Sequence, residues 1–168
     1  LQSDHECTSL AEAEEKLRRG MYIFIREGST ECNISDLIGL VTPLTVSRCS
    51  FATDDCHADT LYKNGHIDHC IRRAVECGLD PGLAYRMATL SPAERFGLFD
   101  RGALTPGRRA DFCIIDDLPT CRVRKVFVKG KEVLPDLLQV TKVDPQEPFR
   151  CPIPDTGAIS ISGSGAAR

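Results

Sequence analysis

The sequence of 168 residues has no long apolar run and no excess of basic charge, and these two absences narrow the range of functions. No stretch of 18 or more consecutive apolar residues is present, so the pattern predicts no membrane-spanning helix and no membrane partner. The net charge of −3 supplies no basic field for a phosphate backbone, which disfavours nucleic acid as a partner. A free purine base is compatible with this charge.

Paired cysteine spacings are also absent. The nine cysteines are scattered, and no two of them form a C-x-x-C pair, which disfavours a zinc knuckle. We therefore predict that most of the cysteines are reduced and buried as small hydrophobic residues.

The first ten residues, LQSDHECTSL, contain no basic stem before an apolar stretch, so they do not match a signal peptide. The expected compartment is the cytoplasm. Because this opening has no initiator methionine and carries polar residues from position 4, we expect the chain to have been cut from a longer one.

What is present is an alternation of helical and strand patterns. Strands are predicted within 21–29 and 47–55, where β-branched and aromatic residues run into polar ones. Helices are predicted over 9–20, near 33–41 and over 66–98, where turns divide the last block into three helices. Helix alternating with strand is typical of a parallel α/β fold.

Three helix starts carry capping signals. Ser9 with Glu12, and Ser91 with Glu94, have the spacing of a capping box. Asp80 precedes a proline in the first helical position and is predicted to be an N-cap.

The pattern changes near residue 100. A strand is predicted within 102–117 after a Pro-Gly turn, and 125–133 is predicted to form a hairpin that turns at Lys129 and Gly130. Beyond residue 135 the sequence is rich in proline, glycine and serine, which is typical of a loose tail.

Polar residues gather where the predicted strands end. These residues are Asp4, His5 and Glu6 before the first helix, Arg26 and Glu27 after the next strand, and Asp54 and Asp55 after the following one. Active sites of parallel α/β folds form at the carboxyl ends of the strands, so these residues are candidates for one site.

Each candidate has a structural alternative. Two adjacent carboxylates, Asp54 and Asp55, are costly unless a cation or proton lies between them, which favours a metal site, but an aspartate after a strand can equally cap a helix. His5 is either a metal ligand or a solvated side chain. Arg26 and Glu27 either form a structural ion pair or position a substrate.

Several motifs together resemble a known family. They are, in order, QSDHEC, IREGS, FATDD, GHIDHC, MATLSPAERFGL and GALTPGRRADFCIIDD. From about residue 3 to about residue 135 this order is similar to the second half of the bacterial-type adenine deaminases, within the amidohydrolase superfamily of metal-dependent hydrolases. The last motif is general to the superfamily, whereas SDHEC, IREGS and GHID point to the adenine deaminase branch.

The resemblance implies a fold and a domain organisation. Residues 1–98 are expected to be the last strands and helices of a TIM-like hydrolase barrel, 99–135 part of a small β-sandwich domain, and 136–168 a tail. A complete barrel takes about 250 residues. Since this chain is shorter than that, we expect an incomplete fold. The upstream metal ligands of the superfamily are not in this chain, so we expect it to be inactive alone.

The resemblance also implies roles for individual residues. His5 and Asp54 correspond to metal ligands, or His5 to a group over the reacting carbon, and Asp54 is expected to shuttle the proton of the attacking water. Asp55 and Glu27 are expected to assist catalysis. The predicted substrate-binding residues are Arg26, Ser29 and His66.

The implied reaction is the hydrolysis of adenine to hypoxanthine and ammonia, a step of purine catabolism. The implied cofactor is a divalent metal, manganese first, with iron or zinc as alternatives, and the full-length enzyme is a candidate homo-oligomer. Two other hypotheses stay open: a different amidohydrolase such as a cyclic amide hydrolase, and a non-catalytic remnant. A nucleic-acid deaminase is disfavoured because its H-x-E and P-C-x-x-C motifs are absent.

Overall fold

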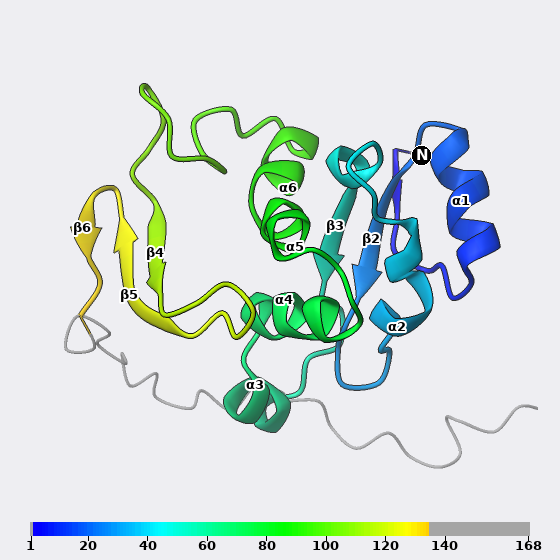
Figure 1. Cartoon of the computed structure of the whole chain (residues 1–168), viewed down its shortest axis with the longest axis horizontal. Helices are drawn as coiled ribbons and strands as arrows, with labels where there is room; N and C mark the ends of the chain where they lie inside the picture. Colours follow the sequence, from blue (N-terminus) through cyan, green and yellow to red (C-terminus); the bar gives the residue numbers. More distant parts are fainter. Residues whose placement is uncertain (1, 135–168) are drawn as a thin grey trace, which may run out of the picture. The chain divides into compact units, whose positions relative to one another are not determined.

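Two three-stranded sheets, one parallel and one antiparallel, organise residues 2–134, which are the part of the chain that the computed structural model describes (Figure 1). This mixture of helices with a parallel sheet confirms the predicted α/β class. The predicted tail at 136–168 lies outside the described residues. Within 2–134, none of the helices combines the length and the apolarity needed to cross a bilayer.

The parallel sheet has the order β1-β2-β3, with β1 at Ser3–Asp4, β2 at Tyr22–Arg26 and β3 at Cys49–Ala52. Both predicted strands are present, and β1 is an additional strand. The chain returns between the strands through four helical segments: α1 (Leu10–Arg18), α2 (Ile34–Leu37), η1 (Ile38–Leu40) and η2 (Val46–Arg48). Because all three strands run in the same direction, their carboxyl ends lie at one edge of the sheet.

Four helices follow β3. They are α3 (Ala58–Asn64), α4 (Ile67–Glu76), α5 (Pro81–Ala88) and α6 (Leu90–Arg95). In Figure 1, α1 and α2 lie beside β2, while α4, α5 and α6 contact β3. The three helices predicted over 66–98 are therefore confirmed, and α3 is additional.

One face of the parallel sheet forms the core. Ile23 and Ile25 of β2, with Cys49 of β3, are fully buried against the helices. Side chains alternate between the faces of a strand, so Phe24 points to the opposite face. That opposite face carries the hollow described below.

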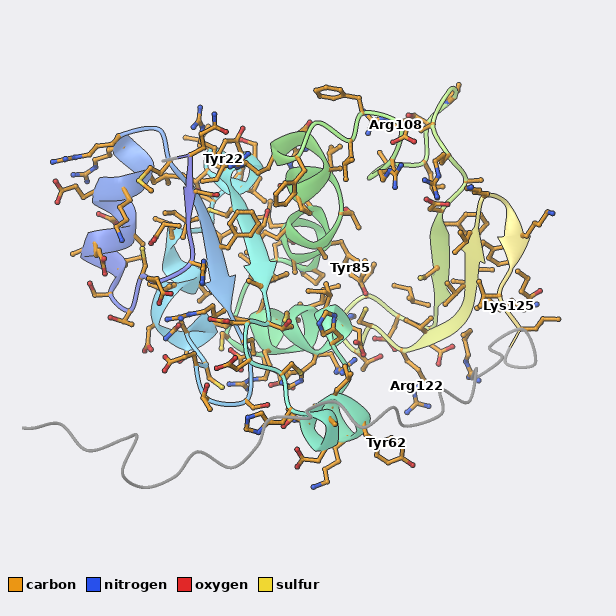
Figure 2. All side chains as sticks on the ribbon, turned by 180° about the vertical axis from the view of Figure 1, so that it is seen from behind. Tyr22, Tyr62, Tyr85, Arg108, Arg122 and Lys125 are labelled. Atoms are coloured by element: carbon orange, nitrogen blue, oxygen red, sulfur yellow. The ribbon has the colours of Figure 1, made fainter. Side chains whose placement is uncertain are left out.

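The antiparallel sheet consists of β4 (Phe112–Ile115), β5 (Val123–Val128) and β6 (Lys131–Glu132). The predicted hairpin is confirmed, because Lys129 and Gly130 between β5 and β6 have φ angles of 53° and 75°. Two left-handed residues in succession form the turn whose twist matches that of the strands. The loop between β4 and β5 is bonded to helix α5, because the hydroxyl of Tyr85, labelled in Figure 2, donates to the Leu118 carbonyl oxygen at 3.1 Å.

Both predicted capping boxes are wrong. Ser9 is the N-cap of α1 but makes no side-chain cap, and Glu12 instead accepts from Lys16 Nζ at 2.7 Å. Ser91 lies inside α6, is fully buried and donates to the Val46 carbonyl oxygen at 2.7 Å. In the first case Glu12 pairs with Lys16 and not with the cap. In the second case the buried Ser91 hydroxyl binds a backbone carbonyl oxygen and does not begin the helix.

The third capping prediction is confirmed: the Asp80 carboxylate accepts from the Leu83 N–H at 3.2 Å at the start of α5. The two additional elements carry little sequence signal. Strand β1 has two residues, too few for an alternation, and α3 buries none of its side chains, so it has no apolar stripe.

The cysteines within 2–134 are free thiols, as predicted, but only half of these eight are buried, namely Cys7, Cys49, Cys70 and Cys121. Burial raises the pKa of Cys49 and of Cys70 to about 12, which leaves both thiols protonated and unreactive at neutral pH. Cys32 and Cys113 are exposed, so the predicted burial is wrong for these two cysteines.

Candidate functional site

Three of the predicted site residues meet at the carboxyl edge of the parallel sheet. His5 follows β1 directly, Arg26 is the last residue of β2, and Asp54 lies two residues beyond β3. His5 Nε2 is 3.8 Å from Asp54 Oδ2, and Arg26 Nη1 donates to the same carboxylate oxygen at 3.2 Å. Residues separated by 49 positions in the sequence thus share one site because parallel strands align their ends.

A third ligand-type side chain, Glu6, joins this group. Glu6 Oε1 lies 3.3 Å from His5 Nε2. One potential metal-ligand atom from each of His5, Glu6 and Asp54 lies within 4.8 Å of the other two. The sequence places Glu6 among the polar residues at the strand ends, but does not single it out as a site residue. Its adjacency to His5 at the end of a strand is the signal that could have found it.

Arg26 is the buried centre of the edge, with only 5% of its surface exposed. Its Nη1 donates to Glu6 Oε2 at 2.9 Å as well as to Asp54, and its Nε donates to Asn33 Oδ1 at 3.2 Å. Burial alone would lower the pKa of Arg26, but the adjacent Asp54, Glu6 and Glu31 carboxylates outweigh it and raise that pKa. The guanidinium therefore stays charged and offsets the repulsion between the two carboxylates that it joins.

The backbone of Asp54 is left-handed, with φ at 48°. This conformation costs most residues about 1–2 kcal/mol, and aspartate is among the few that adopt it routinely. The interpretation of Asp54 or Asp55 as a helix cap is wrong, because α3 begins after His57. Asp55 is exposed, and its carbonyl oxygen accepts from the Ser29 N–H at 2.8 Å.

Glu27 is buried, but its carboxylate has other partners. Its Oε1 lies 3.5 Å from Arg73 Nε, and its Oε2 accepts from the Ile34 N–H at 3.4 Å. Arg26 and Glu27 therefore form ion pairs with different residues and not with each other. Glu27 ties the end of β2 to α4 and α2.

The predicted substrate-binding residues Ser29 and His66 also make contacts outside the His5, Glu6 and Asp54 group. The Ser29 hydroxyl bonds to Thr60 Oγ1 at 2.9 Å and accepts from the backbone N–H of His57 at 2.9 Å. His66 Nε2 lies 3.0 Å from Thr53 Oγ1. Both side chains hold the loops that follow β2 and β3.

An open hollow of about 370 Å³ is lined by two of the three ligand-type side chains, His5 and Asp54. Its floor is apolar, since the Phe24 and Phe96 rings lie 5.9 Å apart between centroids and Ala52 completes the surface. His5 and Asp54 form its polar rim. The apolar and polar parts of this surface suit a ligand that has both apolar and polar groups.

Asp68, two residues after the predicted site residue His66, is expected to make the free energy of unfolding sensitive to acid. Burial raises the pKa of Asp68, but hydrogen bonds from the His66 N–H at 2.7 Å and from Arg72 at 2.8 Å outweigh it, so the pKa lies below its ordinary 3.8. A lowered pKa stabilises the folded state above pH 3.8, and that contribution is lost as pH falls through the folded value. We expect Asp68→Asn to flatten the fall in unfolding free energy below pH 4.

Urea unfolding at a series of pH values measures this effect. Asp59→Asn, at an exposed carboxylate in α3, is the matched control and is expected to retain the acid sensitivity of the unmodified chain. Equal slopes for the unmodified chain and Asp68→Asn would contradict the assignment.

Comparison with known proteins places this chain in a family. The amidohydrolase family model matches residues 8–133. Proteins named adenine deaminase from Methanoregula boonei and Methanoculleus marisnigri are 58% identical over 166 residues and 56% identical over 168 residues. These alignments cover 99% and 100% of this chain, but only 30% and 32% of the two relatives.

Solved structures support the fold. The β-aspartyl dipeptidase of Fervidobacterium islandicum AW-1 matches 82% of this chain and 39% of its own, with a TM-score of 0.59 at 18% identity. The N-acetyl-D-glucosamine-6-phosphate deacetylase of Mycobacterium smegmatis matches 68% of this chain and 33% of its own, with a TM-score of 0.55 at 23% identity. At these identities the similarity concerns the fold alone.

Proposed function

Since the chain belongs to the amidohydrolase family, we propose that it is the carboxyl-terminal part of an enzyme that hydrolyses adenine to hypoxanthine and ammonia. The relatives at 58% and 56% identity that carry the name adenine deaminase support this activity over that of a cyclic amide hydrolase. Because this chain spans 30% and 32% of their lengths, the activity is proposed for the longer protein, and the chain alone is expected to be inactive.

The fold supports the same conclusion. Within residues 2–134, strands β1 and β3 each have one neighbour, and the face that carries Phe24 is open. We infer that the remainder of the longer protein supplies further parallel strands, so that β1 to β3 become part of a TIM-like barrel. In this arrangement 1–98 belongs to the barrel and 99–135 to a small β-sandwich domain, which β4 to β6 begin.

The donor set at the sheet edge fits a divalent cation. His5 provides an imidazole nitrogen, and Glu6 and Asp54 each provide a carboxylate oxygen, a combination that suits zinc, manganese or iron. Manganese is the metal that the family resemblance favours. When bound, such a cation lowers the pKa of water from 15.7 to about 7.

The residues of this chain would act around that centre. Asp54 would accept the proton of the attacking water and return it to the ring nitrogen or to the leaving amine, which is general acid–base work. Arg26 would orient the Asp54 carboxylate for this transfer. Phe24 and Phe96 would bind the purine face, while His5 would lie near its reacting edge.

Five further assignments stay predictions from the sequence. They concern Asp55 and Glu27 in catalysis, and Arg26, Ser29 and His66 in substrate binding. The contacts of Glu27 with Arg73, and of Ser29 with the backbone of His57, favour structural roles for these two residues.

The observation that carries the proposal is the convergence of His5, Glu6 and Asp54 from two strand ends, beside an apolar hollow, in a chain 58% identical to a protein named adenine deaminase. A chimeric enzyme tests it. This chain would replace the matching segment of the Methanoregula boonei relative, and hypoxanthine and ammonia would be measured with adenine as substrate. The unmodified relative is the control.

We expect the chimera to deaminate adenine, to lose activity after treatment with a chelator, and to regain it with manganese. An inactive chimera beside an active parent would contradict the proposal. Gel filtration and fractionation of cells that express the chimera would test the predicted homo-oligomer and the cytoplasmic location.

A further inference from the structure

Two loops at the carboxyl edge of the sheet are bonded together through their backbones. The first follows β2 and begins at Glu27, and the second follows β3 and contains Asp54. The Glu27 N–H donates to the Ala52 carbonyl oxygen at 2.9 Å, and the Ser29 N–H donates to the Asp55 carbonyl oxygen at 2.8 Å. These bonds fix the backbone on both sides of Asp54.

Gly28 makes this approach sterically feasible. A Cβ atom at Gly28 would lie 2.2 Å from the Thr53 carbonyl oxygen and 2.8 Å from that of Asp55. Contacts this short with backbone atoms cannot be relieved by the rotation of a side chain. Any other residue at position 28 would therefore push the two loops apart.

Ser29 adds a side-chain bond on the far side of Asp54. Its hydroxyl oxygen accepts from the backbone N–H of His57 at 2.9 Å and also bonds to Thr60 Oγ1 at 2.9 Å. The second loop is thus bonded at positions 52, 55 and 57, and Asp54 lies inside this span in its left-handed conformation.

We propose that Gly28 and Ser29 are positioning residues that hold the left-handed backbone of Asp54, and thereby direct its carboxylate toward His5. We call Gly28, Ser29 and their bonds to the second loop the strand-end latch. The latch gives Ser29 a role different from substrate binding. Its catalytic consequence rests on the proposed deaminase function, whereas its structural consequence does not.

The test compares Ser29→Ala, Ser29→Thr and Thr30→Ala in the chimeric enzyme. Loss of the Ser29 hydroxyl frees the His57 N–H, so we expect kcat to fall about 10- to 100-fold through misplacement of Asp54, with KM unchanged. Ser29→Thr keeps a hydroxyl and is expected to restore most of the activity. Thr30→Ala removes the neighbouring exposed hydroxyl and is expected to change neither parameter.

Hydrogen exchange of the backbone around His57 provides a readout that does not depend on activity. We expect Ser29→Ala to speed the exchange of the His57 amide, and Ser29→Thr and Thr30→Ala to leave it slow. Gly28→Ala is expected to act in the same direction as Ser29→Ala and more strongly.

The possible failures are distinguishable. An unmodified chimera that is inactive would refute the deaminase proposal, while faster His57 exchange in Ser29→Ala would still support the latch. Unchanged exchange in Ser29→Ala would overturn the latch itself. A rise in KM with kcat unchanged would overturn the positioning role and assign Ser29 to substrate binding.

Discussion

Replacing Asp54 with asparagine in the chimeric enzyme is expected to lower kcat for adenine by about 10²- to 10⁴-fold, the contribution of a general acid–base group. Asparagine has nearly the shape of aspartate and also tolerates a left-handed backbone, so the loop keeps its conformation. The variant loses the negative charge, so it would lose the proposed proton transfer and would bind the proposed metal more weakly through a neutral amide oxygen. Steady-state kinetics with adenine measure the effect.

The matched control is Asp59→Asn, which neutralises an exposed carboxylate of α3 and is expected to keep full activity. A thermal midpoint of Asp54→Asn close to that of the unmodified chimera would show that the fold is intact. If Asp54→Asn retained most of its activity, Asp54 would be neither the proton shuttle nor an essential ligand.

Replacing Ile25 with alanine is expected to lower the free energy of unfolding by about 2–5 kcal/mol. Ile25 lies in the central strand β2, and its side chain is fully buried between the sheet and the helices. The substitution removes three methyl or methylene groups from water-free packing and leaves a cavity that the rigid strand cannot close. Urea unfolding of the chain, followed by circular dichroism, measures the loss.

Ile114→Ala is the comparison variant, because Ile114 lies in β4 of the other sheet and is 46% exposed. Its effect on the free energy of unfolding is expected to be within about 0.5 kcal/mol, which is usual for exposed positions. Equal losses for the two variants would mean that the parallel sheet is not the stabilising core of the chain.

The elements predicted correctly are those whose signals are local. Strand β2 combines β-branched and aromatic residues, Asp80 precedes a proline, and the turn at Lys129 and Gly130 uses a glycine at a left-handed position. Each of these features acts through the residue's own backbone or its near neighbours. The sequence is sufficient in such cases because the physical cause lies within a few positions.

The errors come from partners that are distant or that compete. Ser91 donates to Val46, a residue 45 positions away, and no local spacing reports that contact. Glu12 has Lys16 one helical turn away, and this pair prevails over the capping box. A two-residue strand such as β1 is visible only once β2 has provided a partner for it.

The candidate site divides in the same way. Arg26 and Asp54 could be predicted because parallel strands bring their ends together, a rule that needs only the order of the elements. His5 follows a strand that the pattern does not predict, so its place in the site comes from the family resemblance. Glu6 and the strand-end latch could not be predicted, because their roles depend on which atoms of neighbouring loops approach one another. That approach is set by packing between residues that are 20 or more positions apart.

The left-handed backbone at Asp54 also limits how this position can change in evolution or in a randomised library. Of the twenty amino acids, glycine, asparagine and aspartate adopt that conformation most readily, and only aspartate among them is anionic. Mutants that survive a screen for expression alone should therefore be enriched in these three residues. Selection for a well-formed loop thus restricts position 54 to a few residue types before any selection for catalytic activity acts.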